Sequence, residues 1–304
     1  MIELIATAES INQARLLIDA DVDTLYIGEA TFGLRLPANF SPEEIKEICH
    51  IAHAEHKNVC VAMNAIIHND RIKLIPRYLD FLQEAGVDYV TIGDPGVIHL
   101  LNKYEVPIPY VYDPHTLVTS AKQVNFWAKR GAKGAVLARE LTYEELISIS
   151  QHADVPVEVL VYGATCIHHS KRPLVTNYFS YTNEKSKNQE HLFISEPKKP
   201  KTHYSIYEDL NGTHIFDTND INLLPHLEKL VNAGISKWKL DGIYTRGQAF
   251  VEVVKQFVQA KQALLDKDWS EELKEKLNEK VQEHHPSERT LGEGFFLKNP
   301  NDVQ

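Results

Sequence analysis

The chain has 304 residues, of which 43% are hydrophobic, and it carries a formal net charge of −10. This composition provides for a full core and excludes wholesale disorder, and the negative charge argues against a general nucleic-acid binder. Its three cysteines are too few for a disulfide framework, which favours a reducing compartment. The N-terminus lacks the basic start and apolar stretch of a signal peptide, and no run of about 18 apolar residues is present. We therefore expect a cytoplasmic protein without a membrane span.

Short apolar runs alternate with longer amphipathic stretches along the chain, a pattern typical of strand–helix units. The apolar runs predict strands at residues 2–6, 24–27, 59–63, 89–92, 110–112, 135–137, 157–162 and 237–240. The amphipathic stretches predict helices at residues 11–19, 41–55, 71–85, 96–103, 120–129, 142–151, 223–231 and 248–265. Ser41, followed by proline and two glutamates, and Thr142, with a glutamate three residues on, are typical helix starts.

Eight strand–helix units favour a (β/α)₈ barrel of the TIM type over residues 1–265. An open doubly wound sheet is the second interpretation, and it is disfavoured because the units continue without a second-domain break. A long polar insertion at about 164–222 follows the seventh strand, and the turn Leu210-Asn-Gly inside it predicts a hairpin between residues 204–208 and 213–217. A charged helix at 270–282, solvated His284 and His285, and a loose tail are expected within residues 266–304.

In such a barrel the residues that follow each strand converge at one rim. Most of the predicted rim positions are polar, and they include Gly28, Glu29, Arg35, Asn64, Asp94, Asp113, His115, Thr116, Arg139, Glu140, residues 162–166 and Asp241. Arginine, asparagine and carboxylates together suit a polar or anionic ligand. For Arg139 and Glu140 the alternative to ligand binding is an ion pair that stabilises the rim.

Cys166 has three interpretations: a nucleophile, a metal ligand or a core residue. A nucleophile needs a depressed pKa and a base, for which His168, His169 and His115 are candidates, but no separate orienting carboxylate is evident. Adjacent histidines in an extended chain point in opposite directions, so the pattern is weak as a zinc site. The sequence also lacks nucleotide-binding and zinc-protease motifs, and we predict no metal site.

The insertion is basic although the chain is acidic. Between residues 165 and 203 there are seven Lys/Arg and three Asp/Glu, a net charge of +4, so the remainder carries −14. The same stretch contains Tyr178, Phe179, Tyr181 and Phe193. Basic and aromatic residues on one segment can grip phosphates and stack on bases, which favours tRNA as a partner of residues 165–203. The alternative is an ordinary solvated loop.

Several segments spread along the chain match one family. They are residues 26–28, Phe32, Arg35, 38–41, 136–141, 157–163, Cys166, Ser170, Arg172, Asn177, Tyr178, 211–215, Asp220, 238–242 and 294–296. On these residues the chain resembles the collagenase-like peptidase family U32. The best-understood members of that family hydroxylate tRNA wobble uridine, ribosomal RNA or ubiquinone precursors.

The departures from the family pattern concern its cysteines. Cluster-bearing relatives have four, and here only Cys166 matches, because Pro173 occupies the second position and residues 180–207 contain none. A [4Fe–4S] centre normally needs four thiolates, so we expect that this chain binds no cofactor of its own. The chain therefore resembles a cysteine-poor branch of the family. Ile243 also replaces the arginine that usually follows the acid–glycine pair of the eighth strand.

The resemblance implies a part in wobble-uridine 5-hydroxylation of tRNA, with a cluster-bearing paralogue as partner and prephenate as an anionic co-substrate. The alternatives are a collagenase-like peptidase and a non-catalytic scaffold subunit, so enzymatic activity of the chain alone stays open. We expect Cys166, Glu140 and Asp241 to carry the chemistry. The residues expected to bind substrate are Arg35, Asn64, His115, Arg139, Arg172, Asn177 and Tyr178.

Overall fold

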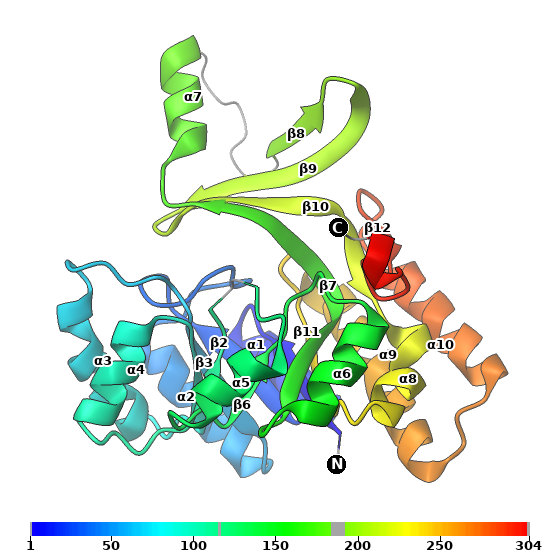
Figure 1. The fold of residues 1–304 in the computed structure, drawn as a ribbon, viewed down its shortest axis with the longest axis horizontal. Coiled ribbons are helices and arrows are strands. Elements are labelled where there is room, and N and C mark those ends of the chain that lie inside the picture. The colour runs from blue at the N-terminus through cyan, green and yellow to red at the C-terminus, as the bar shows by residue number, and fades with distance from the viewer. Residues whose placement is uncertain (1, 115–116, 184–191, 303–304) are drawn as a thin grey trace.

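The computed structural model describes residues 2–114, 117–183 and 192–302. Eight parallel strands follow one another in the order β11-β1-β2-β3-β4-β5-β6-β7, and β11 also pairs with β7, which closes the barrel (Figure 1). The strands are β1 (Glu3–Thr7), β2 (Thr24–Gly28), β3 (Asn58–Met63), β4 (Tyr89–Ile92), β5 (Tyr110–Tyr112), β6 (Gly134–Val136), β7 (Val157–Ser170) and β11 (Lys237–Leu240). The predicted (β/α)₈ barrel is confirmed, and the open sheet is wrong.

Helices cover the outside of the barrel. They are α1 (Ile11–Asp19), α2 (Pro42–Ala54), α3 (Ile75–Glu84), α4 (Pro95–Lys103), α5 (Ala121–Ala128), α6 (Tyr143–His152), α8 (Leu227–Asn232) and α9 (Gly247–Asp266), with short 3₁₀ turns η1 (Ile72–Leu74) and η2 (Leu224–His226). Ser41 and Thr142 form capping boxes with Glu44 and Glu145, as their spacing predicts. No helix in the described ranges is long and apolar enough to cross a membrane.

The inside of the barrel is partly polar. Lys239 on β11 places its Nζ 3.3 Å from the ring centroid of Tyr26 on β2, past the intervening strand β1. The same Nζ lies 3.8 Å from Oε1 of Glu158 on β7, and both of these side chains are at most 6% exposed. The contact between Lys239 and Tyr26, which lie on non-adjacent strands, is made through the interior of the closed barrel.

Over its described residues the predicted insertion extends the sheet of the barrel. β7 continues past Tyr162 to Ser170, and β10 (Gly212–Asn222), β9 (Lys199–Asp209) and β8 (Leu192–Glu196) add to it in turn as antiparallel strands. The predicted hairpin is present and longer than expected. These strands rise above the barrel, and α7 (Leu174–Thr182) lies at their far end (Figure 1).

The C-terminal segment packs against the barrel and the insertion and is not a loose tail. After α10 (Glu271–His284), β12 (Thr290–Gly292) pairs with β10, and a 3₁₀ turn η3 (Pro300–Asp302) follows. Phe296 is 3% exposed and packs on Tyr143. The His285 side chain is 5% exposed and its Nδ1 lies 2.9 Å from the Tyr162 hydroxyl, so its predicted solvation is wrong.

Candidate functional site

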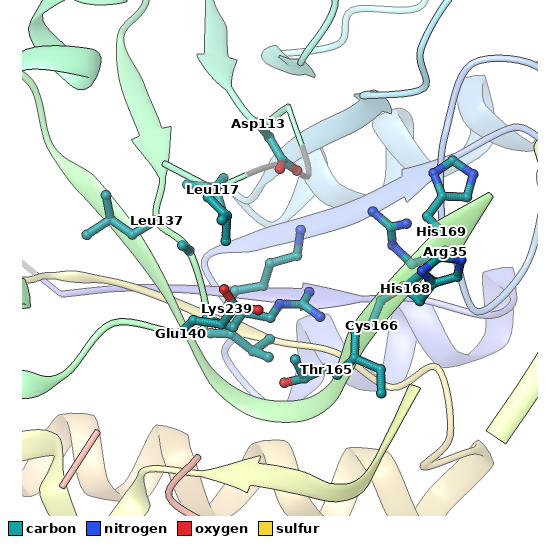
Figure 2. Close-up of a pocket in the computed structure, with 15 residues that line it drawn as sticks. Arg35, Asp113, Leu117, Leu137, Glu140, Thr165, Cys166, His168, His169 and Lys239 are labelled. Carbon is teal, nitrogen blue, oxygen red and sulfur yellow. Dashed lines mark hydrogen bonds between the residues drawn. The ribbon is translucent and has the colours of Figure 1, made fainter. Parts of the chain in front are cut away.

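A cavity of about 310 Å³ opens at the carboxyl ends of the barrel strands, beneath the insertion. Figure 2 shows Cys166 and Arg35 close together at one side of it and Glu140 towards the other. Of the residues expected to carry chemistry or bind substrate, the cavity brings together Arg35, Arg139, Glu140 and Cys166. The rest of its wall is formed by Asp113, Leu117, residues 136–138, Leu160, Thr165, residues 167–169 and Lys239.

Two arginines give the cavity a cationic side. Arg35 has a left-handed φ of 52°, is only 7% exposed, and its Nε has no hydrogen-bond partner. Arg139 donates from Nη1 to the backbone carbonyl of Ala164 at 2.7 Å, and among the described residues no ion pair joins it to Glu140. The Lys239 amine adds a third cation, and the Asp113 and Glu140 carboxylates also line the cavity, so its cations outnumber its carboxylates by one. The excess favours an anionic ligand.

His214 of β10 links Asp209 to Cys166. Its Nε2 lies 3.0 Å from Oδ1 of Asp209, and the ring is close enough to the Cys166 thiol to lower the pKa of that thiol. The thiol itself donates to the backbone carbonyl of His168 at 3.3 Å. His169 stacks on the His214 ring with centroids 4.6 Å apart, and the His214 side chain is fully buried. Asp209 and His214 therefore form a carboxylate–imidazole pair near Cys166 that the sequence does not reveal.

The charges around Cys166 favour its thiolate. Burial by itself raises the thiol pKa, but the hydrogen bond from His214 and the charges of Arg35 and Arg139 outweigh it, and the pKa of Cys166 lies below its ordinary value. Burial likewise lowers the pKa of His214, yet its hydrogen bonds to Asp209 and Cys166 raise it on balance. These neighbours therefore favour the charged forms of both the thiol and the imidazole.

Asn64 and Asp241 are not among the residues that line the cavity. Asn64 is 1% exposed, donates to Oδ2 of Asp113 at 2.9 Å, and accepts from the backbone amide of Leu34. Asp241 is 6% exposed, and burial raises the pKa of its carboxyl. A Cβ at Gly163, where φ is +123°, would meet the Asp241 carbonyl oxygen at 2.4 Å, so glycine is required where β7 leaves the barrel.

The remaining predicted binding residues are not at the cavity. Arg172 lies just before α7, Asn177 and Tyr178 lie on that helix, and all three are exposed on the far part of the insertion (Figure 1). His115 falls outside the described residues. The roles assigned to all these residues from the sequence stay predictions.

The cysteines do not provide the ligands of an iron–sulfur cluster. Cys49 is buried on α2, Cys60 is buried in β3 inside the barrel, and Cys166 lies on β7 at the cavity. Among the described residues no group of three or more His, Cys, Asp or Glu is arranged to hold a metal ion. The donor set of this chain therefore does not fit a four-thiolate cluster.

Comparisons with known proteins agree with the fold and the motifs. The family model of peptidase family U32 matches residues 9–304. The chain is 36% identical over 302 residues to tRNA hydroxylation protein P2 of Bacillus subtilis (strain 168), covering 97% of both chains. It is 25% identical to tRNA hydroxylation protein P of Escherichia coli (strain K12), over 79% of this chain and 63% of the relative.

A solved structure carries the same fold. The U32 peptidase Mk0906 superposes with a TM-score of 0.52 at 15% identity, over 79% of this chain and 92% of the other. The family match and the close relative each cover nearly the whole chain. This chain belongs to peptidase family U32.

Proposed function

We propose that the chain takes part in the 5-hydroxylation of wobble uridine in tRNA, in the cytoplasm. The observation that carries this proposal is the cation-lined cavity at the barrel mouth, directly beneath an insertion that exposes basic and aromatic side chains. The names of the Bacillus and Escherichia relatives support the same reaction class.

The ligand of the cavity is, in this proposal, a small carboxylate such as prephenate. Arg35 and Arg139 present guanidinium groups to the same space, and guanidinium binds carboxylates with two parallel hydrogen bonds. The unpartnered Nε of Arg35 is buried, so a ligand oxygen there would remove the cost of leaving that donor unsatisfied. Lys239 adds charge from the barrel interior.

The insertion is the proposed contact with tRNA. Tyr178 is 57%, Tyr181 88% and Phe193 44% exposed, values that are high for aromatic side chains in a folded protein. Lys171 and Arg172 lie at the start of the same segment and are also exposed. Exposed rings beside cations match the combination of stacking and phosphate contacts with which proteins hold single-stranded nucleic acid.

A cluster-bearing paralogue is the proposed partner. Hydroxylation of a base is an oxidation, and the side chains of this chain do not fit an iron–sulfur cluster. Electron transfer would then be supplied by the paralogue, while this chain binds the carboxylate and the RNA. A pure scaffold role differs from this proposal in one respect: a scaffold would not need the cavity arginines.

Deleting the gene and measuring tRNA nucleosides by mass spectrometry tests the function. We expect hydroxyuridine-derived nucleosides to disappear, to return with the wild-type gene, and to stay absent with Arg139→Gln. Arg77→Gln, at an exposed position on α3, is the matched control and should restore them. Normal nucleosides in the deletion strain would contradict the proposal, and full rescue by Arg139→Gln would favour the scaffold.

Peptide hydrolysis is the second candidate, because Asp209, His214 and Cys166 resemble the acid–base–nucleophile order of a thiol protease. A cavity of about 310 Å³ is, however, at the small end of ligand pockets and gives little room for an extended polypeptide. Gelatin cleavage by the purified chain that is lost in Cys166→Ala would support this candidate. We expect no cleavage.

A further inference from the structure

The strands that leave the barrel carry a chain of polar side chains that ends at the cavity. β7 and β10 are antiparallel neighbours, with His169 opposite His214 and Cys166 opposite Phe216. The register shifts between Ile215 and Phe216, next to His214. This arrangement lets a base on one strand reach a thiol on the other, although the two residues are not direct partners in the ladder.

The tautomer of His214 follows from its neighbours. Asp209 is the partner of Nε2, and hydrogen bonds and the charge of His214 outweigh burial and hold the pKa of this carboxyl below its ordinary value. A carboxylate only accepts hydrogen bonds, so Nε2 carries the proton and Nδ1 faces the cavity side. Stacking on His169 and contact with Tyr207, with centroids 4.9 Å apart, keep the ring in this orientation.

The groups that face Cys166 come from several elements. Arg35 lies in the loop after β2, Arg139 follows β6, and His214 is on β10; each of them lowers the pKa of the thiol. Tyr207 and Tyr244 also lie near the thiol, and burial is the main cause that raises the pKa of both phenols. His169 has a pKa lowered mainly by burial. Among these groups His214 and the two arginines favour the thiolate, and burial opposes it.

The position of Arg35 near Cys166 indicates which kind of ligand the thiol would contact. Arg35 is more than nine-tenths buried, its Nη1 reaches only the Nδ1 of His214 at 3.5 Å, and its Nε has no partner. Buried donors in native proteins are almost always satisfied, so this guanidinium indicates a missing anionic ligand. A carboxylate that fills this position would bring its neighbouring carbon towards the thiol.

We propose that Cys166 is a nucleophile directed at small carboxylates that carry an electrophilic carbon, such as 2-oxo acids. Arg35 holds the carboxylate, and the Asp209–His214 pair activates the thiol.

In the chemical step, the thiolate sulfur bonds to the carbonyl carbon, the π electrons of the carbonyl move to its oxygen, and the His214 imidazolium donates a proton to that oxygen. The product is a hemithioketal, and the reverse step releases the ligand. No oxidant or reductant is needed. This inference rests on the carboxylate site that the proposed function places at Arg35, and its test uses no RNA, so its failure would leave the part in tRNA hydroxylation standing.

Alkylation of the purified full-length chain by iodoacetate and iodoacetamide tests the nucleophile. The two reagents share one chemistry, and only iodoacetate carries a carboxylate. Cys49 and Cys60 do not compete, because both are buried and burial raises their thiol pKa values, that of Cys49 to about 12. We expect the rate with iodoacetamide to be half-maximal below the pH of about 8.5 at which a free cysteine ionises.

The ratio of the two rates tests the carboxylate site. We expect the ratio of the alkylation rate with iodoacetate to that with iodoacetamide to be about ten times higher at Cys166 than at the free thiol of glutathione. A factor of about ten is what one charged hydrogen bond supplies. Arg35→Gln should remove this preference, His214→Gln should move the pH profile upwards, and the exposed Arg77→Gln should change neither. A wild-type ratio equal to that of glutathione, or a wild-type profile centred at or above pH ~8.5, overturns the proposal whether or not the variants fold.

Protection from iodoacetamide tests the covalent step. Pyruvate and lactate have the same carboxylate, but only pyruvate has a carbonyl for the thiolate to attack. We expect pyruvate to slow alkylation of Cys166 at concentrations where lactate does not. Equal protection by both acids would contradict adduct formation.

Discussion

Replacing Arg289 with methionine is expected to lower the free energy of unfolding by about 3–5 kcal/mol, the usual cost of leaving one half of a buried ion pair. The guanidinium donates from Nε and Nη2 to the Asp220 carboxylate at 2.6–3.0 Å, and from Nη1 to the Ser205 hydroxyl at 2.6 Å. Arg289 is 7% and Asp220 1% exposed. The variant would leave the Asp220 carboxylate buried without its countercharge, at the point where the C-terminal segment meets the insertion.

Urea unfolding followed by circular dichroism measures this loss. The matched control is Arg15→Met, because Arg15 pairs with Glu47 at 2.9 Å but both side chains are about half exposed. Exposed pairs contribute at most about 1 kcal/mol, so the control should unfold close to the wild-type urea concentration. Equal effects of the two substitutions would contradict the structural role given to Arg289. Asp220→Asn in the Arg289→Met background should recover part of the loss, because it removes the unpaired charge.

The barrel could be predicted from the sequence because its strands and helices follow local rules. Apolar runs mark buried parallel strands, and the predicted bounds of β4, β5 and β11 agree with the structure residue for residue. The insertion and tail follow no such rule. α7 has no buried residue and hence no apolar face that a periodicity could reveal. The tail is held by contacts between residues far apart in sequence, such as Arg289 and Asp220, which no local pattern encodes.

The candidate site also has a part that the sequence predicts and a part that it does not. Arg35, Arg139, Glu140 and Cys166 converge because the residues after parallel strands of a barrel share one rim, and the strand positions were predicted correctly. His214 was missed because its position depends on how β10 folds back along β7 and on the irregular register between them. Two signals were available: His214 lies in the segment 211–215 that matches the family, and it follows the Leu210-Asn-Gly turn within reach of Asp209 across that hairpin.

The polar interior of the barrel could also have been predicted from charged residues within the strand sequences. Lys237 and Lys239 alternate with Trp238 and Leu240 in β11, so both lysines face the side of the strand that lines the barrel. Glu158 interrupts the apolar run of β7. A charged residue within a strand that is otherwise apolar indicates an inward-facing group with a partner. Pairing the two strands would have placed Glu158 opposite Lys237 and two residues along the strand from Lys239, which it approaches in the structure.

The wild-type protein is expected to lose about 2–3 kcal/mol of stability between pH 5 and pH 8 through Glu158 alone. Burial is the main cause that raises the pKa of this carboxyl, from 4.5 to about 7, and Lys239 offsets only part of it. The folded protein then holds the proton more tightly than the unfolded chain. Stability from this group is therefore full below pH 4.5, and it is lost as the pH rises through about 7.

Urea unfolding of the wild type and Glu158→Gln at a series of pH values isolates this effect, because other titrating groups contribute equally to both proteins. The wild-type stability should fall between pH 5 and pH 8 by about 2–3 kcal/mol more than that of the variant. Glu84→Gln, at an exposed position on α3, should keep the wild-type dependence. The variant is also expected to be less stable than the wild type at pH 8, since the buried Lys239 amine then lacks its countercharge. Parallel pH profiles for the wild type and Glu158→Gln would mean that Glu158 is ionised across the whole range and that the Lys239 amine offsets its burial in full.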